Sequence, residues 1–157
     1  EVIAEHGGIG VRSRVGHSYI KNLMAESGAV FGGEHSGHFY FKNFWRADSG
    51  MLAGLYAIAE LMASKGNLAQ LLAPYNRYVA SGEINSKVKD VTKSIAKVRD
   101  KYHGKYQVDE LDGLTITAST WWFNLRPSNT EPLLRLNVEA DTKKEMIKIR
   151  DAVLALI

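Results

Sequence analysis

The chain has 157 residues, of which 45% are hydrophobic and 24% charged, with a formal net charge of +3 at pH 7 and no cysteine. This length is enough for one ordinary domain or two small ones, and the lack of cysteine excludes disulfides and thiolate metal sites. No apolar run approaches the ~18 residues of a membrane span and no signal peptide is visible, so we expect a cytoplasmic protein without a membrane partner. The weak positive charge suits a phosphorylated ligand but does not by itself indicate nucleic acid.

Helices and short strands alternate in the first half of the chain. Because the chain opens with Glu1-Val2 rather than methionine, we interpret it as a fragment of a longer protein. Apolar residues at spacings of three and four predict a helix at 17–27, which Gly28 would end in a left-handed conformation. The other expected elements are strands at 10–14 and 29–31, an aromatic strand from 39 to 48, a helix at 50–65 between an N-cap in Asp48-Ser49 and Gly66, and a shorter helix from Asn67 to Pro74.

The segments after Pro74 are shorter, more charged and richer in β-branched residues, so we place a domain boundary near Ser81-Gly82, between residues 1–81 and 82–157. The alternation of apolar and polar residues predicts several strands here. The expected elements are strands at 84–88, 114–117, 121–125 and 133–140, a helix at 90–102, and a last helix that opens with a capping box from Thr142 to Glu145. This half is predicted to be a small α+β unit with an antiparallel sheet and helices on one side.

A polar loop with three glycines, Gly32–His38, lies between two of the expected strands. Its side chains allow several interpretations. Glu34, His35 and His38 could supply metal ligands, although neighbours along a strand point to opposite faces. A histidine could act as a general acid or base. Glu34 and Ser36 are the partners that sugar hydroxyls need, which makes a polyhydroxylated ligand the best fit. A polar turn with solvated histidines remains the alternative.

A second polar loop, residues 126–132, joins two other expected strands. Arg126 has the side chain whose planar fork matches phosphate geometry. Ser128, Asn129 and Thr130 add small polar groups whose backbone N–H groups can form an anion-binding nest. The alternative is a tight turn whose Ser and Asn satisfy only their own backbone.

Two further features are weaker signals. His17 follows Gly16 at a strand-to-helix junction, where a helix N-terminus would favour an anion, although a lone histidine there is more often a cap or a surface residue. The lysine-rich second half, with Trp121 to Phe123 available for base stacking, leaves nucleic-acid binding as an alternative. Interleaved acidic residues dilute the positive charge, so we expect no nucleic-acid partner.

Two motifs in this order resemble the α-D-phosphohexomutases, and the resemblance covers essentially the whole chain. GGEHSGH, followed by an aromatic segment, an Arg-Ala-Asp-Ser-Gly turn and a long helix, is similar to that family's sugar-binding third domain. RPSNTEPLLRLNVEA is similar to the phosphate-binding loop and following strand of its fourth domain. Within the family, His35 and Asn129 make the sequence more similar to the phosphomannomutase/phosphoglucomutase branch. The alternative, the phosphoglucosamine mutase branch, usually has Gln in place of His35 and Gly in place of Asn129.

The resemblance implies the C-terminal part of an isomerase: part of an α/β sugar-binding domain, residues 1–81 with a hinge, and a phosphate-binding α+β domain, residues 82–157. It implies reversible phosphoryl transfer between C6 and C1 of a hexose phosphate, through a phosphoserine and a glucose or mannose 1,6-bisphosphate. Glu34, Ser36 and His38 would bind the sugar, and His17 and His38 would contact ligand and assist proton transfer. Arg126, Ser128, Asn129 and Thr130 would hold the non-reacting phosphate.

The family's serine motif and its Asp-rich magnesium motif, which belong to domains 1 and 2, do not occur in this sequence. The resemblance therefore implies that Mg²⁺ and the phosphorylated serine lie outside these residues, and that this fragment alone is inactive. A stand-alone phosphosugar-binding module without catalysis is the alternative from another functional class. The sequence does not distinguish glucose from mannose phosphates.

Overall fold

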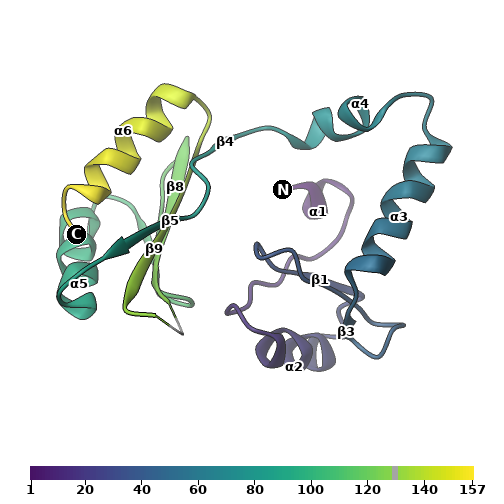
Figure 1. The fold of residues 1–157 in the computed structure, drawn as a ribbon, viewed down its shortest axis with the longest axis horizontal. Coiled ribbons are helices and arrows are strands. Elements are labelled where there is room, and N and C mark those ends of the chain that lie inside the picture. The colour runs from purple at the N-terminus through teal and green to yellow at the C-terminus, as the bar shows by residue number, and fades with distance from the viewer. Residues whose placement is uncertain (129–130) are drawn as a thin grey trace. The chain divides into compact units, whose positions relative to one another are not determined.

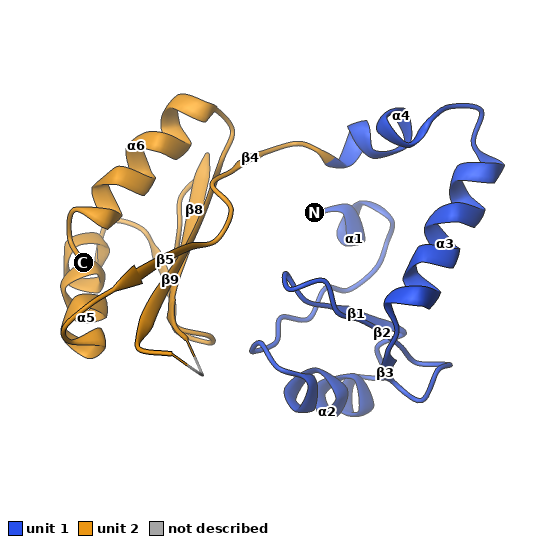
Figure 2. Cartoon of the chain, viewed as in Figure 1, with its two compact units in different colours: residues 1–75 blue, residues 76–157 orange. Residues whose placement is uncertain are grey.

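The computed structural model describes residues 1–128 and 131–157, which form two compact units, Glu1–Tyr75 and Asn76–Ile157. Figure 2 shows them in different colours. The strand Val79–Ala80 pairs with the sheet of the second unit, and the domain boundary near Ser81-Gly82 stays a prediction.

The first unit contains one small antiparallel sheet and several helices (Figure 1). Its strands lie in the order β1-β2-β3, so that the chain passes along the sheet by two successive reversals. The elements are α1 (Val2–Glu5), α2 (His17–Ser27), β1 (Phe31–Gly33), β2 (Phe39–Phe41), β3 (Ala47–Asp48), α3 (Gly50–Ala63), α4 (Leu68–Leu72) and the 3-10 turn η1 (Ala73–Tyr75).

Local capping sets the ends of these helices, largely as predicted. Gly28 ends α2 with φ 71°, a left-handed conformation that costs glycine little. The Ser49 hydroxyl accepts a hydrogen bond from the Leu52 N–H and so caps α3, which leaves the neighbouring Asp48 carboxylate for another role. Asn67 and Gln70 form a reciprocal capping box on α4. The long helix ends at Ala63, before the predicted stop at Gly66.

Three strand predictions for this unit were wrong. Residues 10–14 are irregular and have no strand neighbour in the described part of the chain. The strand predicted at 29–31 is displaced to Phe31–Gly33, where it pairs with β2. The aromatic strand stops at Phe41, because a turn with Trp45 and Arg46 both at φ 52° reverses the chain and pairs β3 with β2.

The buried core of the first unit is small and lies between α2 and the sheet. Its buried members are Ile20, Met24 and Tyr40, and Tyr40 is fully buried. A Cβ atom at Gly32 would lie 3.0 Å from both the Ile20 and the Met24 side chains, so glycine there allows β1 to approach α2 closely. No described helix is both long and apolar enough to cross a membrane.

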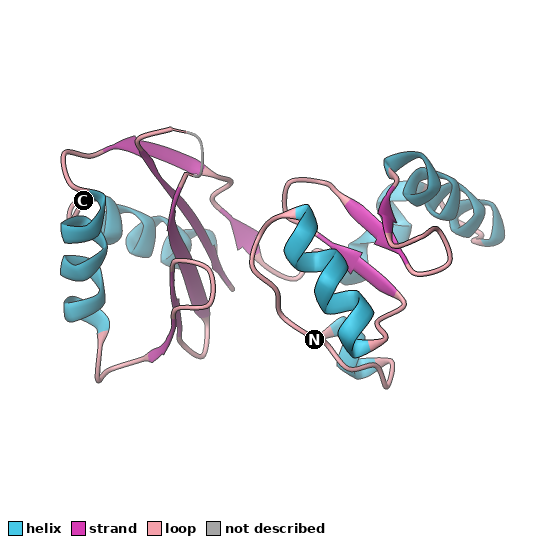
Figure 3. Ribbon diagram, turned by 90° about the horizontal axis from the view of Figure 1, so that it is seen from below, coloured by secondary structure: helices cyan, strands magenta, loops and turns pink. Residues whose placement is uncertain are grey.

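The second unit is an antiparallel sheet with two helices on one face (Figures 1 and 3). The strand order is β4-β9-β8-β7-β6, and β5 also pairs with β9. The elements are β4 (Val79–Ala80), β5 (Ile84–Lys87), α5 (Val91–Tyr102), β6 (Gln107–Asp109), β7 (Leu114–Thr117), β8 (Trp121–Pro127), β9 (Leu133–Ala140) and α6 (Lys143–Leu154). The mixed helical and antiparallel fold class is thus confirmed, although β4 and β6 were not predicted.

Alternation along β8 and β9 decides which side chains enter the core of this unit. Phe123, Leu125, Leu134 and Leu136 are fully buried and pack with the apolar faces of α5 and α6. The residues between them point to the face of the sheet without these helices. Arg126 lies opposite Arg135 in the β8–β9 register, so the strand pairing brings these two arginines together.

Gly113 lies in the turn before β7, where the chain passes close to β8. It has φ 71°, and an added Cβ atom would lie 2.6 Å from the Leu125 carbonyl oxygen. Gly104 has φ 76° but nothing within 4 Å of that position. We expect Gly104→Ala to lower the free energy of unfolding by about 1 to 2 kcal/mol through backbone strain. Gly113→Ala should cost about 1 to 3 kcal/mol more because of the steric clash.

Urea denaturation followed by tryptophan fluorescence measures both changes, and Trp121 and Trp122 report on this unit. Equal effects of the two substitutions would contradict the close approach between Gly113 and β8.

Candidate functional site

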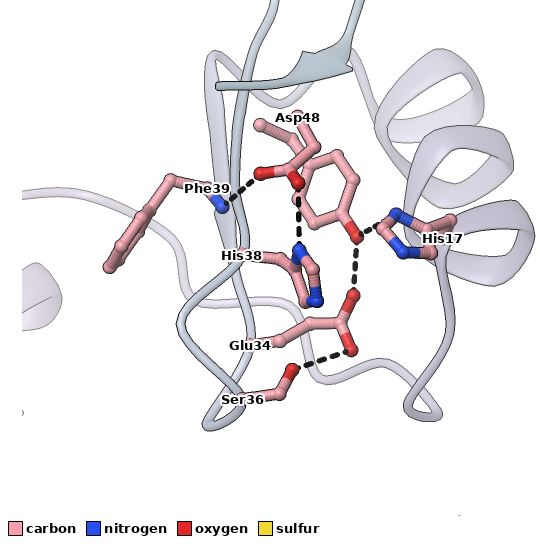
Figure 4. Close-up of polar contacts among 7 residues, drawn as sticks. His17, Glu34, Ser36, His38, Phe39 and Asp48 are labelled. Carbon is pink, nitrogen blue, oxygen red and sulfur yellow. Dashed lines mark hydrogen bonds and ion pairs between the residues drawn. The ribbon is translucent and has the colours of Figure 1, made fainter. Parts of the chain in front are cut away.

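The polar loop that joins β1 to β2 closes as a hairpin. The Glu34 N–H donates to the His38 carbonyl over 2.9 Å, and the Gly37 N–H donates to the Glu34 carbonyl over 3.0 Å. Gly37 has φ 83°, which the turn requires. Figure 4 shows that the side chains of Glu34, Ser36 and His38 lie on one side of this hairpin together with His17.

His17 comes from a different element, the first turn of α2, and reaches the hairpin through a tyrosine. The hydroxyl oxygen of Tyr40 lies 2.7 Å from His17 Nδ1, and the same hydroxyl donates a short hydrogen bond to Glu34 Oε1. Ser36 Oγ donates a longer one to Glu34 Oε2, at 3.4 Å. Burial, followed by the hydrogen bond to Glu34, raises the pKa of Tyr40, so its phenol stays protonated at neutral pH.

His38 is held by Asp48 at the end of β3. His38 Nδ1 and Asp48 Oδ2 are 2.7 Å apart, and the Phe39 N–H donates to Asp48 Oδ1 over 2.9 Å (Figure 4). The β2–β3 register pairs Tyr40 with Asp48, which brings the carboxylate beside the histidine. The hydrogen bond with Asp48 raises the pKa of His38, and the hydrogen bond with His38 lowers the pKa of Asp48.

The two imidazoles lie together with one carboxylate. The rings of His17 and His38 have centroids 4.6 Å apart in an edge-on arrangement. Donor atoms of His17, His38 and Asp48 all lie within 4.8 Å of one another. Two nitrogens and one oxygen are not the all-oxygen set that Mg²⁺ prefers, so this cluster does not fit a magnesium ion.

His35 does not join this cluster, so the sequence-based metal alternative of Glu34, His35 and His38 is not the set that the fold assembles. Its exposed side chain instead lines a cavity of about 300 Å³ beside the loop. Arg12, Arg14 and Glu34 line the same cavity.

Replacing Asp48 by asparagine should lower the pKa of His38. In the native pair, the raised His38 pKa favours folding below its ordinary value of 6.5, an effect lost as the pH rises through the raised value. The lowered Asp48 pKa favours folding above 3.8, an effect lost as the pH falls through the lowered value. Both contributions to the stability of the fold are therefore present between pH 3.8 and pH 6.5, the ordinary pKa values of the two groups.

Histidine titration by NMR measures this change directly. We expect the His38 midpoint to fall in Asp48→Asn and to stay unchanged in Asp90→Asn, which removes the charge of the aspartate that caps α5 in the second unit. An unchanged midpoint in Asp48→Asn would show that Asp48 does not control the protonation of His38.

The second candidate group lies on the sheet of the second unit. Arg126 Nη2 is 3.3 Å from Glu83 Oε2, and Arg135 Nε is 3.6 Å from Glu83 Oε1. The Arg126 side chain is 13% exposed, so its guanidinium is largely fixed before any ligand arrives. Glu83 therefore orients Arg126 at the end of β8, next to the loop that was predicted to bind phosphate.

Described residues at the two ends of the predicted loop are hydrogen-bonded to each other. The Ser128 N–H donates to the Leu133 carbonyl over 2.8 Å, and Ser128 Oγ accepts from the Glu131 N–H over 3.2 Å. The serine therefore bonds to backbone groups of its own loop, and its predicted contact with phosphate stays a prediction. Asn129 and Thr130, the other two predicted phosphate ligands, lie outside the described residues.

Sequence reasoning missed three residues that hold these groups: Tyr40, Asp48 and Glu83. In the sequence, Tyr40 was only one residue of an expected aromatic strand, and Asp48 was one of two candidates for a helix cap. A signal for Asp48 did exist, because an aspartate followed by a second capping residue is free to bond elsewhere. No local signal connects Glu83 to Arg126, which are 43 residues apart.

Comparisons with known proteins agree with both halves of the chain. Residues 1–78 match the family model of phosphoglucomutase/phosphomannomutase α/β/α domain III, and residues 83–156 match that of the phosphoglucomutase/phosphomannomutase C-terminal domain. The chain belongs to the phosphoglucomutase/phosphomannomutase family, as its motifs predicted.

Relatives with assigned activities are similar over most of the chain. A phosphomannomutase of Methanocaldococcus jannaschii is 46% identical over 146 residues, which are 93% of this chain and 32% of that protein. A phosphomannomutase of Escherichia coli is 39% identical over 161 residues, 100% of this chain and 35% of that protein. The chain thus spans about a third of the length of these relatives.

A solved structure also matches both units. The crystal structure of a phosphoglucomutase/phosphomannomutase family protein from Burkholderia thailandensis superposes with a TM-score of 0.82 at 30% identity. The match covers 98% of this chain and 33% of that one.

Proposed function

We propose that this chain is the sugar- and phosphate-binding part of a phosphomannomutase/phosphoglucomutase, which interconverts hexose 6-phosphates and hexose 1-phosphates. The observation that carries the proposal is the convergence of Glu34, Ser36, His17 and His38 beside one hairpin. Carboxylate, hydroxyl and imidazole groups are suited to the dense set of donors and acceptors on a sugar ring. Family membership and the phosphomannomutase relatives support the same reaction class.

Each group has a distinct role in this proposal. Glu34 accepts hydrogen bonds from sugar hydroxyls, with its carboxylate held by Tyr40 and Ser36. Arg126 and the loop that follows bind the phosphate that is not reacting, because a guanidinium can donate two parallel hydrogen bonds to phosphate oxygens. Sugar recognition thus belongs to the first unit and phosphate recognition to the second.

His38 is positioned to take a proton. Phosphoryl transfer to a sugar hydroxyl requires that the hydroxyl lose its proton. An ionised Asp48 can only accept, so the bond between them places a proton on His38 Nδ1. In neutral His38 this leaves Nε2 as the basic atom, and Asp48 stabilises the imidazolium that forms when Nε2 takes a proton. His17, 4.6 Å away between ring centroids, contacts the same ligand.

The remaining chemistry is proposed to come from residues outside this chain. Domains 1 and 2 of the full-length enzyme would supply the phosphoserine and hold Mg²⁺, which neutralises charge on the phosphoryl group. The reaction would pass through a glucose or mannose 1,6-bisphosphate. The described residues of this chain bind and orient the sugar phosphate, and positioning of this kind is a large part of phosphoryl-transfer catalysis.

Isothermal titration calorimetry with mannose 1-phosphate and glucose 1-phosphate tests the proposal. Inorganic phosphate and the free hexoses serve as partial ligands. We expect both sugar phosphates to bind more tightly than either part alone. Failure of every sugar phosphate to bind, with a native circular dichroism spectrum, would contradict a ligand-binding role for this chain.

Replacing Glu34 by glutamine should alter sugar discrimination. The change keeps the side-chain shape but removes the charge that strengthens hydrogen bonds from hydroxyl groups. We expect the affinity ratio between mannose 1-phosphate and glucose 1-phosphate to change by about 3- to 10-fold. Glu26→Gln, on the exposed face of α2, is the matched control and should leave the ratio unchanged. An unchanged ratio would exclude Glu34 as a reader of the C2 hydroxyl group, the position at which mannose and glucose differ. Unchanged affinities for both sugar phosphates would exclude it as a reader of any hydroxyl group.

A further inference from the structure

Tyr40 joins the core of the first unit to the polar site. Its residue is fully buried and packs in the core with Ile20 and Met24, yet its hydroxyl reaches the functional cluster. That hydroxyl is bonded to two groups from different segments, His17 Nδ1 in α2 and Glu34 Oε1 in the hairpin. The core therefore fixes one atom that contacts two ligand-facing side chains.

The donors and acceptors at this hydroxyl can be assigned by counting protons. A phenol has one proton, and an ionised carboxylate can only accept. Tyr40 must therefore donate to Glu34, and its oxygen is left to accept from His17. Only a protonated Nδ1 on His17 can make that bond. A neutral His17 is then the Nδ1–H tautomer, and its Nε2 carries the lone pair.

We propose that Tyr40 is a positioning residue that holds His17 in the Nδ1–H tautomer, so that His17 Nε2 accepts a hydrogen bond from a hydroxyl group of the bound sugar phosphate. The identity of the ligand rests on the function proposed above, whereas the tautomer rests on the geometry of Tyr40 alone. A neutral histidine without such a partner can adopt either tautomer, because the bond made by one ring nitrogen decides the state of the other.

The arrangement makes the two neighbouring histidines alike in one respect and different in another. Tyr40 holds His17 at Nδ1 and Asp48 holds His38 at Nδ1. In both rings Nε2 is therefore the nitrogen left for the ligand. The partner of His38 is a carboxylate, which favours the charged imidazolium. The partner of His17 is a neutral phenol, whose oxygen accepts a hydrogen bond from Nδ1–H and brings no charge to the pair. His17 is thereby suited to accept a hydrogen bond while His38 takes the proton.

Long-range ¹H–¹⁵N correlation spectra of the histidine rings test the tautomer directly. They are recorded on the 157-residue chain without ligand, at a pH where both imidazoles are neutral. We expect His17 to show the Nδ1–H pattern in the native chain and to shift toward the Nε2–H pattern in Tyr40→Phe. Tyr102→Phe, at a buried tyrosine of the other unit, is the matched control and should leave His17 unchanged.

Two results would overturn the proposal: an Nε2–H pattern for His17 in the native chain, or an Nδ1–H pattern that persists in Tyr40→Phe. Mannose 1-phosphate titrations add the second arm. We expect Tyr40→Phe to weaken binding by about 3- to 10-fold, the loss of one oriented hydrogen bond. A changed tautomer with unchanged affinity would overturn the link from Tyr40 to the ligand.

The proposed function fails separately from this proposal. If the native chain shows the Nδ1–H pattern and loses it in Tyr40→Phe but binds no sugar phosphate, the positioning of His17 by Tyr40 is supported and the function proposed above is wrong. If the native chain binds sugar phosphate and His17 shows the Nε2–H pattern, the proposed function is supported and the positioning of His17 by Tyr40 is wrong.

Discussion

The 157-residue chain alone is expected to convert no mannose 1-phosphate into mannose 6-phosphate. In the proposed mechanism, a serine donates the phosphoryl group and Mg²⁺ neutralises its charge. The sequence holds neither a Ser-His-Asn-Pro run nor an Asp-x-Asp-x-Asp run, and the His17–His38–Asp48 cluster has the wrong donors for magnesium. In this chain alone, the sugar phosphate that Glu34 and Arg126 would orient cannot react.

The measurement is phosphorus NMR of the chain with mannose 1-phosphate, Mg²⁺ and glucose 1,6-bisphosphate. A full-length phosphomannomutase under the same conditions is the positive control. Arg126→Ala, purified in the same way, controls for a contaminating host mutase, whose activity would be equal in both samples. Turnover by the native chain that is absent from Arg126→Ala would contradict the expected inactivity of the chain.

The regular elements of the second unit could be predicted because their signals are local. Alternating apolar residues from Leu133 to Ala140 gave the bounds of β9, and Asp90 and Thr142 cap the helices that follow them. The first unit was predicted less well. Its strands have only two or three residues, so their limits depend on pairing and on the unexpected reversal at Trp45 and Arg46 rather than on a repeating pattern.

The residues of the candidate site also differ in how well the sequence predicts them. Composition alone pointed to the hairpin loop, since Glu34, Ser36 and His38 are close in sequence. The residues that orient them are not. Asp48 reaches His38 only because the β2–β3 register places it there, and Tyr40 reaches His17 only because β2 packs against α2. Long-range packing sets these contacts, and one sequence contains no direct record of it.

Arg126→Ala should weaken the binding of every phosphorylated ligand by about 10- to 100-fold, because charge-assisted hydrogen bonds to phosphate are lost. The effect should be equal for mannose 1-phosphate, glucose 1-phosphate and inorganic phosphate. Glu83 already holds the guanidinium in place, so little side-chain freedom remains to be lost on binding. Calorimetry with the three ligands measures the change, and it contrasts with Glu34→Gln, which should alter the ratio between sugars.

Arg135→Ala is the matched control because Arg135 lies directly opposite Arg126 and shares the same carboxylate partner. It removes one positive charge from the same face of the sheet but leaves the Arg126–Glu83 pair intact. We expect less than about a 3-fold loss of phosphate affinity, since a charge without direct contact is screened by water and salt. Equal losses in the two variants would mean that the net charge of this face attracts the ligand and that Arg126 makes no specific bond to phosphate.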